Sequence, residues 1–138
     1  QLLGTEYKEK RIVSKMLNDT FDIFTKIDFV YEDAVATVKV GKGVKSEGEL
    51  IISGTKGYIY VPAPWWKTDY FEVRYEDQSQ NKRYFYQLDG EGIRYELVAF
   101  LKAIETGKSK SYIRQEVSDT MCQVIEDFYN RKDFIELK

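Results

Sequence analysis

The chain has 138 residues, of which 43% are hydrophobic and 32% are charged, and its formal net charge is −2. This length and composition are typical of one folded domain. The small negative charge lacks the basic surface that binding to nucleic acid or an anionic membrane requires, so we expect neither as a partner.

The rarest residue types narrow the possible chemistry further. No apolar run approaches the ~18 residues of a membrane span. The single cysteine, Cys122, excludes an intramolecular disulfide and is compatible with a reducing cytoplasm, where we expect the protein to reside. The absence of histidine removes the commonest general base and metal ligand, and we predict no metal site.

Apolar and polar residues alternate with a period of two between residues 10 and 90, which predicts β-strands. The clearest example is 21–31, and short glycine-containing turns separate several of the others. The predicted strands are 10–17, 21–31, 34–40, 47–53, 57–61, 70–76 and 83–88.

From Gly90 onward the period changes to 3.6 and predicts two helices. The first has an apolar face from Ile93 to Ile104 and ends at Gly107, and the second covers 117–128 and closes near Arg131. Strands followed by helices indicate an α+β fold: an open-faced, mostly antiparallel sheet with helices packed on one face.

The chain contains 11 tyrosines, several of them on predicted strands. They suit either a solvent-facing sheet surface or a subunit interface, where aromatic residues are enriched. Because helices can cover only one face of the sheet, we favour the interface and a homodimer or higher homo-oligomer. The candidate interface residues are Tyr58, Tyr60, Tyr84 and Tyr86.

Both prolines and both tryptophans lie within residues 62–66. Proline cannot donate a backbone hydrogen bond, so the strand should stop pairing at Pro62 and continue as a stiff connection. The Gly54–Gly57 turn lies at one end of a hairpin, which places the loops around residues 41–46 and 62–67 at the other end. The tryptophans and lysines gathered at that end could bind a sugar ring or an anionic group. In the competing interpretation, one tryptophan fills the core and the lysines are solvated. The candidate substrate-binding residues are Lys42, Lys45, Trp65, Trp66 and Lys67.

Other patterns carry no chemistry. Gly41, Gly43 and Gly48 join two strands and do not open a helix, so they do not form a phosphate-binding loop. Cys122 lies on the apolar side of a predicted helix and is expected to be a small core residue. No acidic pair has catalytic spacing, and we assign no catalytic residue.

Two stretches resemble a known family. The run "ATVKVGKGVKSEGELIISGTKGYIYVPAPWW" (36–66) and the run "RYELVAFLKAIETGK" (94–108) resemble the C-terminal domain of the glucose–fructose oxidoreductase / inositol dehydrogenase / rhizopine-catabolism (Gfo/Idh/MocA) family. The most diagnostic elements are the G-T-x-G turn between strands and the helix with "F..AI..G". The resemblance covers nearly the whole chain.

The resemblance implies a parent enzyme with an N-terminal Rossmann domain for NAD or NADP, and a C-terminal sheet domain that shapes the substrate pocket and builds the oligomer. The family's E-K-P lysine motif and its acidic or histidine-bearing motif are absent here, so no catalytic or cofactor-binding residue is carried over. The chain opens on Gln1-Leu2-Leu3-Gly4 without a methionine, and we interpret residues 1–138 as a single C-terminal domain, a fragment whose own Rossmann domain is missing.

The function that this resemblance implies is that of the substrate-shaping and oligomerisation domain of an NAD(P)-dependent oxidoreductase acting on a small sugar-like or polyol substrate. The fragment alone should be inactive and should bind no cofactor. The alternative is a stand-alone carbohydrate-binding or dimerisation module without an enzymatic parent.

Overall fold

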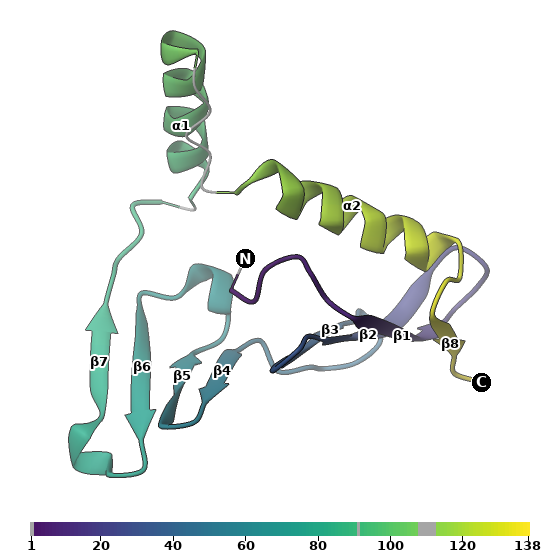
Figure 1. Ribbon diagram of the computed structural model, residues 1–138, viewed down its shortest axis with the longest axis horizontal. Helices are drawn as coiled ribbons and strands as arrows, with labels where there is room; N and C mark the ends of the chain where they lie inside the picture. Colours follow the sequence, from purple (N-terminus) through teal and green to yellow (C-terminus); the bar gives the residue numbers. More distant parts are fainter. Residues whose placement is uncertain (1, 91, 108–112) are drawn as a thin grey trace. The chain divides into compact units, whose positions relative to one another are not determined.

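The computed structural model describes residues 2–90, 92–107 and 113–138. The chain divides into two compact units, one made of Gln1–Ser46 with Tyr112–Lys138 and the other of Glu47–Ser111. We call these the first and the second unit. Each contains a four-stranded sheet and one α-helix (Figure 1). The chain is therefore α+β with mostly antiparallel strands, as the sequence predicts.

The first unit holds the sheet with strand order β3-β2-β1-β8. Strands β1 (Glu9–Met16), β2 (Asp22–Val30) and β3 (Val35–Val40) pair antiparallel in chain order. The short strand β8 (Phe134–Glu136) follows helix α2 (Gln115–Tyr129) and pairs parallel to β1, with Ile12 opposite Phe134. Strand β8 thus forms one edge of this sheet, beside β1.

Alternate residues of β1 point into the core of the first unit. Ile12 and Ser14 are fully buried, and Lys10 is nearly so. Ser14 lies opposite Thr25 in the register, and their hydroxyl oxygens are 2.8 Å apart. Polar residues therefore make up much of this core, and each needs a partner because burial removes its water.

The second unit holds a fully antiparallel sheet with strand order β4-β5-β6-β7. Its strands are β4 (Leu50–Gly54), β5 (Gly57–Val61), β6 (Tyr70–Tyr75) and β7 (Lys82–Phe85). Two 3-10 helices, η1 (Trp65–Lys67) and η2 (Gln78–Gln80), lie in the connections on either side of β6. Helix α1 (Ile93–Thr106) follows, and Gly107 ends it with a φ of 63°. None of the described residues of this unit is fully buried.

The structure departs from the sequence-based expectations in four respects. The strands form two sheets instead of one. Strand β8 was not predicted, and β7 ends at Phe85, before the predicted limit of 88. Cys122 is exposed on α2, so its expected core position is wrong: the helix turns Val117 and Asp127 inward instead.

Among the described residues, no helix combines the length and the apolar character that a membrane crossing requires.

Candidate functional site

The connection after β5 is held in place by backbone hydrogen bonds. The N–H of Trp65 donates to the carbonyl of Gly48 over 2.9 Å, and the N–H of Lys67 donates to the carbonyl of Pro64 over 2.9 Å. A Cβ on Gly48 would lie only 3.3 Å from the Cβ of Ala63. The segment before β4 and the connection after β5 therefore pack together at the end of the hairpin opposite the Gly54–Gly57 turn.

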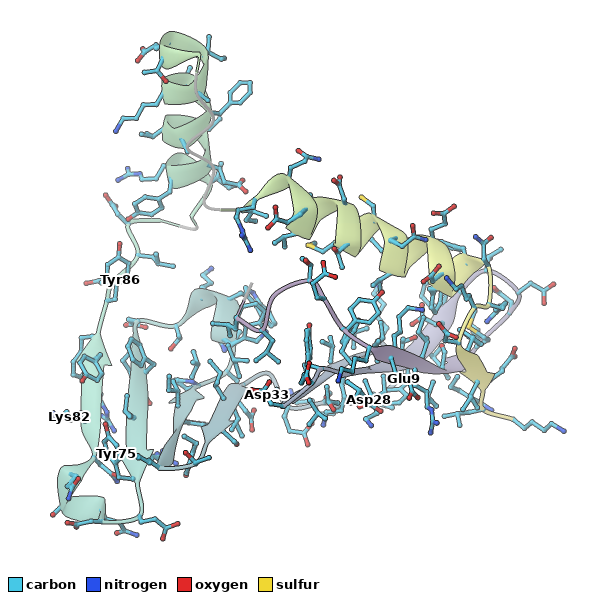
Figure 2. The ribbon with its side chains drawn as sticks, in the orientation of Figure 1. Glu9, Asp28, Asp33, Tyr75, Lys82 and Tyr86 are labelled. Atoms are coloured by element: carbon cyan, nitrogen blue, oxygen red, sulfur yellow. The ribbon has the colours of Figure 1, made fainter. Side chains whose placement is uncertain are left out.

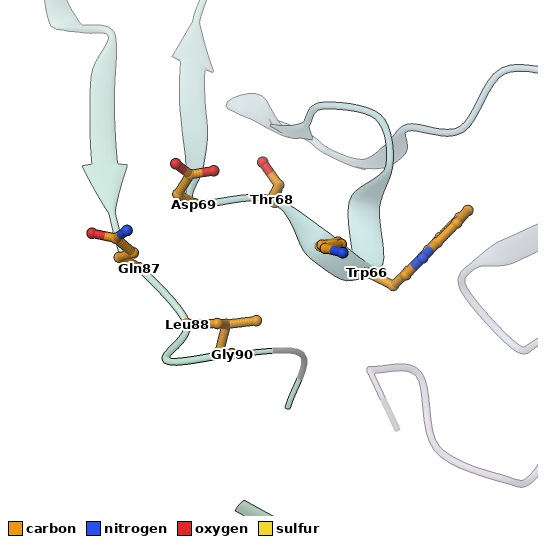
Figure 3. Close-up of a pocket in the computed structure, with 7 residues that line it drawn as sticks. Trp66, Thr68, Asp69, Gln87, Leu88 and Gly90 are labelled. Carbon is orange, nitrogen blue, oxygen red and sulfur yellow. The ribbon is translucent and has the colours of Figure 1, made fainter. Parts of the chain in front are cut away.

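A cavity of about 370 Å³ lies beside η1 (Figure 3). Antiparallel pairing of β6 with β7 brings the start of one strand beside the end of the other, because Tyr70 lies opposite Phe85. One further backbone bond, from the N–H of Tyr86 to the carbonyl of Asp69 (2.7 Å), extends this pairing. The cavity is lined by Trp66, Lys67, Thr68, Asp69, Gln87, Leu88 and Gly90.

Both tryptophans of η1 are accessible. Trp65 is 50% exposed and Trp66 is 64% exposed, and their rings meet edge to face with centroids 6.0 Å apart. The interpretation of one tryptophan as a core plug is therefore wrong. Trp66 contributes to the cavity wall, whereas Trp65 is not among the lining residues.

The structure brings together only part of the predicted substrate-binding set. Trp66 and Lys67 line the cavity and Trp65 adjoins them, all in the second unit. Lys42 and Lys45 lie in the connection between β3 and β4, in the first unit, and are exposed. Their grouping with the tryptophans stays a prediction.

Sequence analysis missed the polar half of the cavity wall. Thr68 and Asp69 come directly before β6, and Gln87 follows β7. The available signal was the predicted pairing of 70–76 with 83–88, which places the residues before the first strand beside those after the second. The hydroxyl of Thr68 donates to the carbonyl of Tyr70 over 3.1 Å and fixes this corner.

The candidate interface tyrosines do not share one sheet face. The register places Tyr58 and Tyr60 on the same face as Glu72 and Arg74, whereas Tyr84 lies opposite Phe71 and so belongs to the other face. Phe71 and Tyr84 stack with ring centroids 5.0 Å apart. Tyr86 lies beyond the end of β7 (Figure 2), and its N–H bonds to the carbonyl of Asp69, which lines the cavity. The expectation of a single face carrying all four tyrosines is therefore wrong.

Ionic contacts hold the side chains on the face of Tyr58 and Tyr60. The guanidinium of Arg74 lies 4.5 Å from the centre of the Tyr60 ring, within the range of a cation–π contact. Glu72 accepts hydrogen bonds from Arg74 and Arg83, and these bonds hold the pKa of its carboxyl below the usual value. This face is charged and aromatic, in contrast to the more aliphatic face around Ile59 and Val73.

A second cluster of ionisable groups lies in the core of the first unit. The Lys10 ammonium is 2.9 Å from a carboxylate oxygen of Asp127 and 2.9 Å from one of Asp133. Burial alone would lower the pKa of Lys10, but the hydrogen bonds to the two carboxylates outweigh it and raise this pKa. The hydrogen bond from Lys10 lowers the pKa of Asp127, and Gln123 adds to this effect. With side chains only 2% and 5% exposed, Lys10 and Asp127 serve packing rather than substrate binding.

Within residues 2–90, 92–107 and 113–138, no three acidic or cysteine side chains gather in a way that would hold a metal ion.

Comparison with known proteins gives a likeness of fold. No family model and no curated protein matches the sequence. Among solved structures, the chain is similar to the crystal structure of a probable oxidoreductase, yhhX, with a TM-score of 0.60 and 17% identity. The match covers 88% of this chain and 41% of that one, so this chain spans about two fifths of the length of that protein. At this identity the likeness shows the fold alone: the chain has a fold that occurs as part of a probable oxidoreductase.

Proposed function

We propose that this chain is the C-terminal substrate-shaping and oligomerisation domain of an NAD(P)-dependent oxidoreductase that acts on a sugar or polyol derivative. The observation that carries the proposal is the unequal coverage of the structural match, 88% of this chain against 41% of a probable oxidoreductase. A fold that accounts for less than half of a redox protein leaves room for a separate cofactor domain in the same enzyme.

The glycines of the described residues do not form the dinucleotide-binding pattern. Gly90 and Gly92 precede helix α1, but Tyr95 stands where the third glycine of G-x-G-x-x-G would follow. Dinucleotides bind where a glycine-rich turn joins a strand to a helix N-terminus. Here Gly41 and Gly43 lie between two strands, and the backbone of that loop packs on Ile23, with the Gly43 N–H bonded to the Ile23 carbonyl over 2.9 Å. In this proposal another domain holds the cofactor, and the reaction is the transfer of a hydride between a carbinol carbon and the nicotinamide.

The cavity beside η1 is the part of this chain that we assign to substrate. Ligand pockets combine an apolar or aromatic wall with a few polar groups that fix orientation. The Trp66 indole and Leu88 supply the first, and Thr68, Asp69 and Gln87 supply the second. This combination suits a small ring whose faces are apolar and whose edges carry hydroxyls.

The open sheet of the second unit supports the oligomerisation role. Tyrosine and arginine are the residue types enriched at protein interfaces, and Tyr58, Tyr60 and Arg74 meet on one face. We propose self-association through this face. Tyr84 and Tyr86 would take part only through the opposite face or the strand end.

The proposal is tested with the protein expressed from its complete reading frame. A panel of sugars and polyols should include at least one that drives reduction of NAD or NADP. With that substrate, Trp66→Ala should raise KM about tenfold or more, which corresponds to roughly 1.4 kcal/mol of lost binding. Trp65→Phe, which keeps an aromatic ring against Trp66, is the control and should leave KM near the wild-type value. Sugar binding without nicotinamide-dependent turnover would favour the stand-alone carbohydrate-binding module instead.

A further inference from the structure

We propose that the cavity beside η1 selects a polyhydroxylated ring that carries an ammonium group, such as an amino sugar. This inference rests on the proposed function insofar as it treats the cavity as the substrate site, and it adds the charge of the ligand. It is carried by the juxtaposition of one available carboxylate, Asp69, with the exposed indole of Trp66 in the wall of the same cavity.

Asp69 presents its carboxylate from a fixed backbone. Its carbonyl accepts the hydrogen bond from the Tyr86 N–H at 2.7 Å, and the neighbouring Thr68 hydroxyl is bonded to the Tyr70 carbonyl. Within the described part of the chain, the Asp69 side chain itself has no hydrogen bond or ion pair. A carboxylate held in this way can accept a charge-assisted hydrogen bond, which is stronger than a neutral one.

The Trp66 indole, like the Asp69 carboxylate, favours a positively charged ligand. The edge-to-face contact with Trp65 and the backbone bonds of η1 hold it in place, while 64% of its surface stays exposed. The face of an indole attracts cations more strongly than the other aromatic rings do. Figure 3 shows Trp66 on the connection that leads through Thr68 to Asp69, so one short segment supplies both cation-favouring groups.

The remaining lining residues suit hydroxyls and a ring. Gln87 offers an amide that can both donate and accept, and it lies across from the Asp69 corner on the adjacent strand end (Figure 3). Leu88 and Gly90 supply an apolar wall. A cavity of about 370 Å³ falls in the size range of small-molecule sites.

Lys67 is the competing feature, because it also lines the cavity and carries a positive charge. Lys67 takes part in an interaction of its own. Because the Trp66 indole in the same wall also favours a cation, we expect Asp69, not Lys67, to set the charge preference. Preferential binding of an anionic ligand such as a sugar phosphate would indicate that Lys67 sets the charge preference instead. A sugar phosphate is therefore included among the ligands tested.

The chain offers a direct readout. Both of its tryptophans lie in η1, so its tryptophan fluorescence comes entirely from the wall of this cavity and its neighbour. The 138-residue chain is titrated with glucosamine, glucose and glucose 6-phosphate at neutral pH. We expect a saturable change with glucosamine and an affinity for glucose at least about tenfold weaker.

Three variants locate the effect. Asp69→Asn should weaken glucosamine binding about tenfold or more and leave glucose binding unchanged. Glu76→Gln removes the same charge from an exposed position in the same unit and should change neither. Trp66→Phe should weaken the binding of both glucosamine and glucose, and Trp65→Phe should not. Circular dichroism confirms that each variant is folded.

Tightest binding of glucose 6-phosphate, an unchanged glucosamine affinity in Asp69→Asn, or binding of none of the three ligands would overturn the inference. These outcomes are separable from failure of the proposed function, since the titration needs no cofactor. Turnover of a neutral polyol by the complete protein, without preference for an amine, would refute this inference and leave the proposed function standing. Amine-selective binding by a complete protein that uses no nicotinamide would support this inference and refute the proposed function.

Discussion

Replacing Lys10 by methionine removes the cation from the buried cluster in the first unit while keeping most of the apolar stem. The Lys10 ammonium lies 2.9 Å from a carboxylate oxygen of Asp127 and 2.9 Å from one of Asp133. Removing one partner of a buried ion pair costs about 3–5 kcal/mol, because the other charge is left without compensation. Asp127 would keep Gln123 at 3.1 Å and Lys132 at 3.6 Å, so we expect a loss near the lower limit, about 3 kcal/mol.

Urea unfolding followed by far-ultraviolet circular dichroism measures this loss. The matched control is Lys8→Met, directly before β1, where Lys8 pairs with Glu32 over 3.5 Å and both side chains are exposed. Exposed pairs contribute about 0–1 kcal/mol, so the control should be nearly neutral. The double variant Lys10→Met/Asp127→Leu should recover part of the loss, since it leaves only Asp133, which is 49% exposed. A loss in Lys10→Met no larger than in Lys8→Met would refute the reasoning.

The remaining predictions concern pH, backbone packing, cofactor and assembly. Because the pKa of Asp127 is lowered in the folded protein, its contribution to stability is full above the unfolded value of about 3.9 and disappears as the pH falls through the folded value. Asp127→Asn should therefore flatten the loss of stability below about pH 4 in acid titrations followed by circular dichroism. Gly57→Ala should lower the melting temperature, because its Cβ would collide with the Arg74 carbonyl oxygen, whereas Gly54→Ala, whose Cβ meets only an oxygen at 3.4 Å, should change it much less. Calorimetric titration of the 138-residue chain with NADH and NADPH should show no saturable heat, and a micromolar dissociation constant would contradict the fragment interpretation. Light scattering over a concentration series should detect self-association that Tyr60→Ser weakens; a wild-type chain that stays monomeric at high micromolar concentration would count against the interface.

The strands with clear alternation were predictable from sequence. Strand β5 has the predicted limits, 57–61, and β2 lies within the predicted 21–31. Strand β8 was missed because three residues, Phe134–Glu136, are too few to show a period, and it forms only through its pairing with β1. The division into two sheets was missed for a related reason: alternation predicts a strand but not its neighbours, which depend on contacts between distant segments.

The candidate site was predictable only where composition is unusual. The concentration of tryptophan and proline led to Trp66 and Lys67, which do line the cavity. Asp69 and Gln87 are ordinary polar residues at strand ends, and only the pairing of β6 with β7 brings them together.

The Lys10 cluster shows the same limit. A lysine on a strand is usually exposed. Here its burial depends on Asp127 and Asp133, more than 100 positions later in the sequence, and on the return of the chain through α2 to the first sheet.

The central claim, that this chain is part of a nicotinamide-dependent oxidoreductase, is tested most directly by calorimetric titration of the protein expressed from its complete reading frame with NADH and NADPH. We predict saturable binding of at least one of them to the complete protein and none to the 138-residue chain measured alongside it. Absence of binding to the complete, folded protein would contradict the claim.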